Sequence, residues 1–209
     1  MITLALSKGR ILEDTLPMLK SMGIEPAGDI GRLLRVPTTA PDLQLVIIRP
    51  ADVPTYVAYG AADLGVTGKD VLMEHGGEGL YEPLDLKIAG CRLSVAQVKD
   101  APALPPHHRL RVATKYPESA REHFLSTGRE AEVIKVNGSV ELAPLTGLAD
   151  GIVDLVATGR TLRENGLVER EQIFDSSARL VANRVSHKLR AAEIDALAGR
   201  LERAVGAAR

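Results

Sequence analysis

The stretch Ile152-Val153-Asp154-Leu155-Val156-Ala157-Thr158-Gly159-Arg160-Thr161-Leu162 decides the fold that the sequence predicts. It begins as an apolar run of strand length, interrupted by one carboxylate, and then changes to small and hydroxyl-bearing residues. The residues that follow have the pattern of a helix. A strand that ends in Thr-Gly-x-Thr before a helix gathers backbone N–H groups and two hydroxyls, an arrangement that most often binds phosphate. The stretch therefore predicts a strand–loop–helix unit of an α/β protein, with an anion site in its loop.

Asp154 is the unusual member of this stretch, because a carboxylate would repel a phosphate. It fits better beside sugar hydroxyls, or beside a metal on the same ligand, so the loop predicts a phosphorylated sugar. An ordinary structural explanation remains open at this point. Thr158 or Thr161 could cap a helix and Gly159 could make a turn, and short glycine-containing loops often match by chance.

Composition limits the classes of function. The chain has 209 residues, enough for one large domain or two small lobes, and its net charge is −1. Aromatic residues are scarce, with no Trp, two Phe and four Tyr. Neither nucleic acid nor a membrane surface is therefore expected as a partner. The single Cys91 excludes an internal disulfide, and the adjacent His107 and His108 are expected in a solvated, proline-rich loop rather than at a metal. No secretion signal or membrane-spanning run is recognised, so we expect a cytoplasmic protein.

Apolar runs and helical patterns alternate along almost the whole chain, which favours α/β architecture with a mostly parallel sheet. Strands are expected at about residues 2–6, 43–48, 64–68, 84–89, 93–98, 110–114, 132–136, 152–157, 168–174 and 179–183. Helices are expected at about residues 11–22, 69–75, 117–125, 140–144 and 186–205, and a further helix is expected to begin after Asp52, which would cap it.

A weak internal repeat suggests two lobes. Residues 60–68 and 147–159 each contain Ala-Asp, an apolar strand and Thr-Gly. Lobe I would comprise residues 1–89 plus about 184–209, and lobe II would comprise residues 90–183. A ligand cleft lined by both Thr-Gly loops is then expected, although short α/β segments also resemble one another by chance.

Cations follow two of the predicted strands. Lys8 and Arg10 come directly after residues 2–6, and Arg49 follows residues 43–48. Open α/β sheets bind ligands at the carboxyl ends of their strands, so these side chains are candidate ligands for anions. Simple exposure to solvent is the alternative.

Seven motifs run in order through residues 1–183. They are Ser7-Lys8-Gly9-Arg10, Arg49-Pro50-x-Asp52-Val53-Pro54, Ala62-Asp63-Leu64-Gly65-Val66-Thr67-Gly68-x-Asp70, Cys91-Arg92-Leu93-Ser94-Val95-Ala96, Ala113-Thr114-Lys115-Tyr116-Pro117, Gly138-Ser139-Val140-Glu141-Leu142-Ala143-Pro144, and the stretch from Gly147 through Leu162. Each is weak alone, but the ordered set resembles the ATP phosphoribosyltransferase family, the first enzyme of histidine biosynthesis.

The resemblance implies two lobes like those of a type II periplasmic binding protein. It implies transfer of the phosphoribosyl group of phosphoribosyl pyrophosphate to N1 of the ATP adenine, with release of pyrophosphate and with Mg²⁺ as cofactor. The chain resembles the short form, which lacks a C-terminal histidine-binding domain. Short forms imply a homodimer of catalytic chains and a regulatory subunit like histidyl-tRNA synthetase, in a hetero-octamer.

The resemblance also implies roles for individual residues. The phosphoribosyl pyrophosphate side would comprise Glu141, Asp154, Ala157, Thr158, Gly159, Arg160, Thr161 and Leu162. The ATP and pyrophosphate side would comprise Lys8, Gly9, Arg10, Arg49, Asp70, Cys91, Arg92 and Ser94, with Arg32 a weaker candidate. Lys8, Arg49 and Asp154 would be catalytic, and Mg²⁺ would be held mainly by substrate oxygens, with Glu141 or Asp154 assisting.

Three alternatives remain at the level of sequence. The chain could be a non-catalytic, two-lobed small-molecule-binding protein or a catalytically silent scaffold. It could also be another phosphoribosyltransferase, although the orotate and purine enzymes usually carry two adjacent acidic residues where Leu155 follows Asp154 here.

Overall fold

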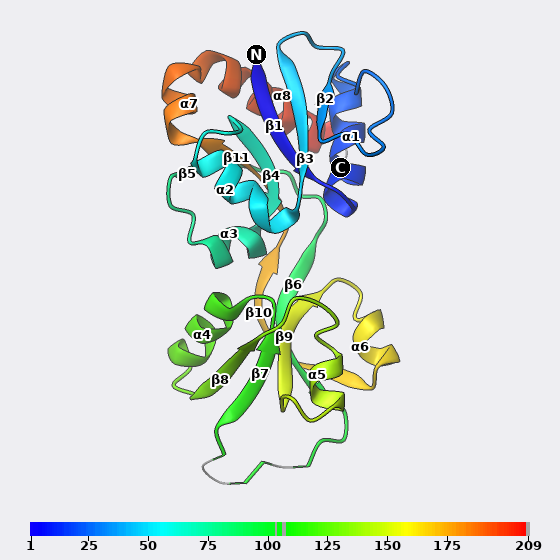
Figure 1. The fold of residues 1–209 in the computed structure, drawn as a ribbon, viewed down its shortest axis with the longest axis vertical. Helices are drawn as coiled ribbons and strands as arrows, with labels where there is room; N and C mark the ends of the chain where they lie inside the picture. The colour runs from blue at the N-terminus through cyan, green and yellow to red at the C-terminus, as the bar shows by residue number, and fades with distance from the viewer. Residues whose placement is uncertain (103, 106–107, 208–209) are drawn as a thin grey trace. The chain divides into compact units, whose positions relative to one another are not determined.

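The computed structural model describes residues 1–102, 104–105 and 108–207. The chain forms two compact units (Figure 1), one of Met1–Ala89 with Ser177–Arg209 and one of Gly90–Ser176. The chain re-enters the first unit at Ser177 rather than at about residue 184, because β11 (Ala178–Asn183) is a strand of the first unit's sheet.

The first unit contains a six-stranded sheet in the order β2-β3-β1-β4-β11-β5. Its strands are β1 (Ile2–Ser7), β2 (Arg35–Pro37), β3 (Leu43–Ile48), β4 (Leu64–Gly68), β5 (Leu80–Asp85) and β11. Only β3, β1 and β4 pair in parallel, and the three outer pairings are antiparallel. The sheet is therefore mixed, with its parallel part at the centre, whereas the sequence had favoured a mostly parallel sheet.

Alternation along β1 explains why helices cover both faces of this sheet. Leu4 and Leu6 belong to the core beneath α1 (Arg10–Ser21) and α8 (Ala191–Ala207), whereas Ala5 packs in a second core with residues of α2 (Val53–Ala58) and α3 (Lys69–His75). Figure 1 shows these two helix pairs on the two faces. The unit is completed by the 3₁₀ turn η1 (Pro50–Asp52) and by α7 (Arg184–Leu189).

The second unit contains a five-stranded sheet in the order β10-β6-β9-β7-β8. Its strands are β6 (Cys91–Val98), β7 (Leu110–Thr114), β8 (Ala131–Lys135), β9 (Gly151–Val156) and β10 (Leu167–Ser176). Strands β9, β7 and β8 pair in parallel, whereas β6 pairs antiparallel with both of its neighbours, β10 and β9. One face packs on α4 (Pro117–Ser126), and the other on α5 (Leu142–Leu145) and α6 (Arg160–Glu164).

Three local expectations were wrong. The strand expected at 84–89 ends at Asp85, because Lys87 and Ala89 have φ angles of 56° and 52°, which an extended strand does not accommodate. Asp52 makes no side-chain capping bond at α2. The closing helix is two helices, separated at Arg190, and the first is capped by Asn183.

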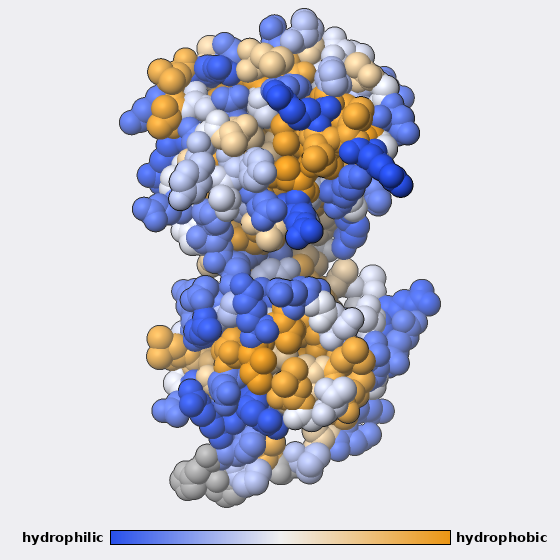
Figure 2. Space-filling model, in the orientation of Figure 1, coloured by the Kyte–Doolittle hydropathy of each residue, from blue (hydrophilic) through white to orange (hydrophobic). Residues whose placement is uncertain are grey.

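The described part of the chain contains no helix with the length and apolarity needed to cross a bilayer. Figure 2 shows that apolar residues nevertheless gather on the drawn face of each unit. Exposed large apolar residues include Leu142, Leu145 and Leu148 in the second unit, and Tyr59, Val185 and Leu189 in the first.

Candidate functional site

The loop between β9 and α6 forms a small pocket of about 160 Å³. Its lining contains Leu155 and Val156 and all eight residues that were predicted for the phosphoribosyl side. These eight are Glu141, Asp154, Ala157, Thr158, Gly159, Arg160, Thr161 and Leu162. The structure therefore brings the expected hydroxyls, carboxylates and loop backbone to one concave surface.

The backbone of this loop is suited to an anion. Gly159 has φ 71° and ψ 9°, the left-handed conformation, and it occupies the cap position of α6 without any side-chain cap. Neither threonine therefore serves as the helix cap, and both threonines are exposed. The Thr158 hydroxyl accepts a long bond, 3.4 Å, from the Arg160 backbone N–H. Because α6 has only five residues, N–H groups and hydroxyls of the loop would contribute more to anion binding than a helix dipole.

Asp154 lies on β9 directly opposite Ser94 of β6, so the two side chains share one face of the sheet. Its carboxylate Oδ1 accepts the Leu155 backbone N–H at 2.9 Å. Glu141 occupies the position just before α5 and reaches the same pocket. The pocket thus offers two carboxylates beside a loop that favours phosphate.

A polar network lies next to this loop on β6 and β10. Arg92 donates from Nε and Nη2 to the Glu169 carboxylate at 2.6 and 2.5 Å, and Ser94 donates its hydroxyl to Glu169 Oε1 at 2.8 Å. The hydrogen bonds from Arg92 lower the pKa of Glu169, and the same bonds raise the pKa of Arg92. Ser94 is fully buried. Arg92 and Ser94 were expected on the nucleotide side, whereas both donate to Glu169, which the sequence did not single out.

In the first unit, Lys8 and Arg49 follow the carboxyl ends of neighbouring parallel strands. Ser7 of β1 pairs with Ile48 of β3, so the residues that follow them are adjacent. Lys8 and Arg49 line a cavity of about 270 Å³ whose other walls are Leu34, Ile47, Ile48 and Pro50. The Lys8 ammonium donates to the Gly31 carbonyl at 2.9 Å. This cavity therefore combines two cations with apolar walls.

The other predicted residues of the nucleotide side are more dispersed. Gly9, with φ 91°, and Arg10 are exposed at the start of α1, and Arg32 is exposed in the following loop. Cys91 is partly buried as the first residue of β6. Asp70 is 5% exposed at the start of α3. None of these residues is part of the described lining of the 270 Å³ cavity.

The two Thr-Gly loops differ, contrary to the expected repeat. Thr67 is fully buried within β4, whereas Thr158 lies beyond the end of β9 and is exposed. Glycine at position 68 avoids a clash with a nearby side chain, because a Cβ there would lie 2.2 Å from Asp70 Oδ1. The first Thr-Gly pair therefore has a packing role, and only the second presents its hydroxyl to solvent.

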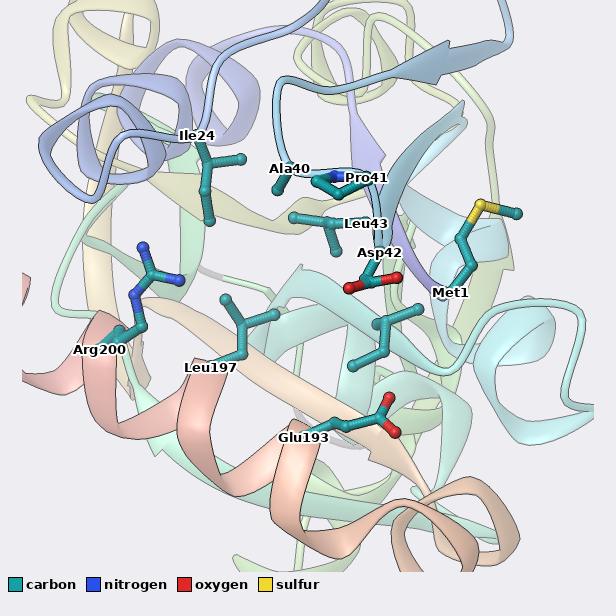
Figure 3. Close-up of a pocket in the computed structure, with 10 residues that line it drawn as sticks. Met1, Ile24, Ala40, Pro41, Asp42, Leu43, Glu193, Leu197 and Arg200 are labelled. Atoms are coloured by element: carbon teal, nitrogen blue, oxygen red, sulfur yellow. The ribbon is translucent and has the colours of Figure 1, made fainter.

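A larger cavity of about 470 Å³ lies between α8 and the loop before β3 (Figure 3). Its charged lining comprises the carboxylates of Asp42 and Glu193 and the guanidinium of Arg200, which donates to the Met22 carbonyl. Two carboxylates and one occupied cation make it a poor site for a polyphosphate, despite its volume.

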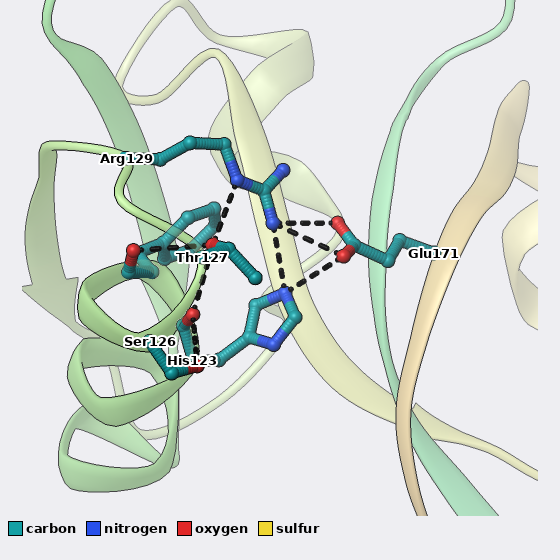
Figure 4. Close-up of polar contacts among 6 residues, drawn as sticks. His123, Ser126, Thr127, Arg129 and Glu171 are labelled. Carbon is teal, nitrogen blue, oxygen red and sulfur yellow. Dashed lines mark hydrogen bonds and ion pairs between the residues drawn. The ribbon is translucent and has the colours of Figure 1, made fainter.

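Two further clusters of charged residues lie in the second unit. The Glu171 carboxylate accepts a hydrogen bond from Arg129 at 2.8 Å and lies 3.2 Å from His123 Nε2 (Figure 4). These contacts link the end of α4 to β10. Asp150 Oδ2 lies 2.8 Å from both His108 Nε2 and the Arg111 backbone N–H. His107 lies outside the described residues. Among the residues described, no three or more His, Cys, Asp or Glu side chains could together hold a metal ion.

Comparison with known proteins identifies similar chains. A family model described as ATP phosphoribosyltransferase matches residues 49–203. The ATP phosphoribosyltransferase of Burkholderia orbicola is 56% identical over 208 residues, covering 97% of this chain and 96% of that protein. A solved complex of ATP phosphoribosyl transferase (HisG:HisZ) from Thermotoga maritima is 33% identical, with a TM-score of 0.86 and 99% coverage of both chains.

A likeness in fold alone extends further. The periplasmic aliphatic sulphonate binding protein SsuA of Escherichia coli is 13% identical, with a TM-score of 0.61, covering 98% of this chain and 72% of that one. The expected α/β architecture with two units like those of a periplasmic binding protein is thus confirmed.

Proposed function

The chain belongs to the ATP phosphoribosyltransferase family, and from this premise we propose how its residues carry out the reaction. The enzyme transfers the phosphoribosyl group of phosphoribosyl pyrophosphate to N1 of the ATP adenine, giving phosphoribosyl-ATP and pyrophosphate. This is the first step of L-histidine biosynthesis. The observation that carries the assignment of residues is the pocket after β9, which is lined by the loop residues, among them two threonines, and by two carboxylate residues.

We assign the 5′-phosphate to the loop of Ala157–Leu162, with Thr158, Gly159 and Thr161 central. The loop supplies neutral N–H and hydroxyl donors, which suit a phosphate that keeps its charge throughout the reaction. The one cation of the loop, Arg160, is paired with Glu164 at 2.7 Å. Asp154 is assigned to the ribose hydroxyls, with Glu141 beside it. A pocket of about 160 Å³ is in keeping with a phosphate and part of a sugar rather than a whole nucleotide.

We assign the pyrophosphate and the ATP to the first unit. Lys8 and Arg49 supply positive charge beside a cavity with apolar walls, a combination suited to phosphates near a nucleobase. Arg10 is the next candidate cation because it is exposed at the start of α1. Arg49 and Lys8 would stabilise the negative charge that develops on the departing pyrophosphate.

The chemistry needs no strong general base. The N1 atom of adenine carries a free lone pair, and the sugar C1 becomes cationic as the bond to pyrophosphate breaks. Asp154, next to the ribose, would favour that positive charge, and the remaining barrier is lowered by holding the reactants in line. Catalysis is therefore positioning and charge stabilisation rather than proton transfer.

Mg²⁺ is the proposed cofactor. It binds proteins through one or two carboxylates and otherwise through substrate phosphates and water, and Glu141 and Asp154 are the carboxylates of the pocket. When bound, the ion would neutralise charge on the pyrophosphate group. This donor set fits Mg²⁺ better than a metal held by protein ligands alone.

A regulatory partner is also proposed, since the similar Thermotoga maritima structure is a HisG:HisZ complex. We expect a subunit like histidyl-tRNA synthetase, together with a homodimer of this chain, in a cytoplasmic assembly. Exposed leucines on both units, and exposed tyrosines on the first, offer apolar surface for such contacts. Size measurements with and without the partner subunit test this expectation.

The variants Asp154→Asn and Thr161→Val test the assignment of the loop. The assay follows the formation of phosphoribosyl-ATP by its absorbance. We expect phosphoribosyl pyrophosphate binding or turnover to weaken by more than about tenfold in each, because a charge or a donor at the substrate is lost. Circular dichroism should show unchanged folding. Wild-type kinetics in either variant would remove that residue from the site.

A further inference from the structure

Two successive carbonyl groups of the phosphate loop are each held by an arginine. Arg92 Nη1 donates to the Ala157 carbonyl at 3.4 Å, and Arg163 Nη1 donates to the Thr158 carbonyl at 3.1 Å. Among the described residues that line the pocket, neither arginine is present. Both carbonyls are therefore turned toward groups outside the pocket lining.

Peptide geometry converts this observation into a statement about the N–H groups. In a planar trans peptide, the C=O of one residue and the N–H of the next point in opposite directions. Holding the Ala157 and Thr158 carbonyls outward therefore directs the N–H groups of Thr158 and Gly159 toward the pocket that these residues line. Gly159 adopts the required left-handed conformation, with φ 71°.

Arg92 is itself fixed in orientation. Its bidentate pair with Glu169 uses Nε and Nη2, which leaves Nη1 for the Ala157 carbonyl. A bidentate pair of this kind fixes the plane of the guanidinium. The Ser94 hydroxyl holds the Glu169 carboxylate from the same side, and Ser94 is fully buried in β6. The order of support therefore runs from Ser94 to Glu169, then to Arg92 and finally to the loop.

We propose that Arg92 and Arg163 are positioning residues that aim the loop N–H groups at the 5′-phosphate, and that Glu169 acts through Arg92. The proposal rests on the proposed function of the loop. It assigns Arg92 to the phosphoribosyl side of the reaction, where the resemblance had implied the nucleotide side. Glu169 and Arg163 acquire a role although neither touches the substrate.

The test uses the full-length chain with its regulatory subunit, and measures KM for each substrate in Arg92→Gln, Glu169→Gln and the double variant. We expect KM for phosphoribosyl pyrophosphate to rise about tenfold in each single variant, as for other misplaced binding groups. KM for ATP should change less than about twofold. The double variant should be no worse than Arg92→Gln, because Glu169 acts only through that arginine.

Glu171→Gln is the matched control. Glu171 is on the same strand and also pairs with an arginine, but its partner Arg129 holds the end of α4 rather than the loop. We expect Glu171→Gln to lower thermal stability as Glu169→Gln does and to leave both KM values unchanged. Equal KM changes for ATP and phosphoribosyl pyrophosphate, additive effects in the double variant, or an equal rise in Glu171→Gln would overturn the proposal.

Thr161→Val separates this proposal from the function of the loop itself. If Thr161→Val weakens phosphoribosyl pyrophosphate binding in calorimetry while Arg92→Gln and Glu169→Gln bind normally, the loop assignment stands and the positioning role is refuted. If Thr161→Val also binds normally, the loop assignment fails, and the positioning proposal fails with it.

Discussion

Replacing Gly159 by alanine tests whether the shape of the phosphate loop determines affinity for phosphoribosyl pyrophosphate. Gly159 has φ 71°, and an added Cβ would lie 3.1 Å from Arg163 Nη1. A left-handed backbone costs an L-residue roughly 1–2 kcal/mol. The arginine tip can shift by a few tenths of an ångström, but that shift would weaken its bond to the Thr158 carbonyl, 3.1 Å long in the structure.

The expected loss follows from that strain. If the alanine loop relaxes when empty, binding must restore the strained conformation, and roughly 1–2 kcal/mol corresponds to about a 5- to 30-fold weaker Kd. Titration calorimetry with phosphoribosyl pyrophosphate measures this change directly. ATP binding provides the internal reference, since the substitution lies in the second unit and ATP is assigned to the first.

Gly166→Ala is the matched control for this prediction. Gly166 has φ 70°, so alanine meets the same backbone strain, but among the described residues none beyond its chain neighbours lies within 4 Å of the added Cβ. It follows α6 at the other end and does not line the pocket. Both variants should lose stability in thermal unfolding, but only Gly159→Ala should lose affinity. Unchanged affinity in Gly159→Ala, or equal losses in both variants, would refute the reasoning.

Three other predictions concern separate parts of the molecule. Arg49→Ala should lower the turnover number by about tenfold or more through lost stabilisation of the leaving group; an unchanged turnover number would remove Arg49 from that role. Gly68→Ala should destabilise the fold, because Asp70 Oδ1 lies 2.2 Å from the new Cβ; urea unfolding with the wild-type midpoint would contradict this. Burial raises the pKa of Asp150, but hydrogen bonds from His108 and Arg111 outweigh it and hold that pKa below its usual value. Its stabilising contribution should be present at neutral pH and be lost as the pH falls below about 4. Asp150→Asn should therefore be less stable than wild type at pH 7 and converge with it in acid, and a constant difference between the two urea curves would exclude this linkage.

The phosphate loop could be predicted from sequence because its information is local. Asp154, Thr158, Gly159 and Thr161 lie within one strand–loop–helix unit, and the strand places them together whatever the rest of the chain does. Glu141 is more distant in sequence, yet it reaches the same pocket, and only the resemblance had indicated it.

The support of the loop could not be predicted in the same way. Glu169 meets Arg92 across 77 residues, and the pairing of β10 with β6 contains register shifts on both sides of Glu171. A one-residue slip of a strand moves its side chains to the opposite face, so no periodic pattern could place this carboxylate. Glu169-Arg170-Glu171 alone suggests only a solvated strand.

The sequence also suggested, wrongly, that the two Thr-Gly loops are alike, and the cause is similar. The sequences around Thr67 and Thr158 resemble each other, but β4 includes Thr67 and Gly68, whereas β9 ends at Val156. Gly68 has an extended conformation with ψ 148°, and Gly159 is left-handed. Relative to the shared Thr-Gly pair, β9 ends three residues earlier than β4, and this decides whether the threonine hydroxyl is buried or exposed.

The distribution of charge between the two sets of residues agrees with the demands of the reaction. The 5′-phosphate keeps its charge from substrate to product, so neutral N–H groups and hydroxyls can hold it. The nearby arginines have other partners: Arg92 and Arg163 donate to loop carbonyls, and Arg160 pairs with Glu164. The pyrophosphate gains negative charge only as its bond to C1 breaks. Cations that strengthen their contacts at that moment lower the barrier more than cations that bind substrate and transition state equally. The exposed side chains of Lys8 and Arg49 are suited to the second task, and the fixed loop of the second unit is suited to the first.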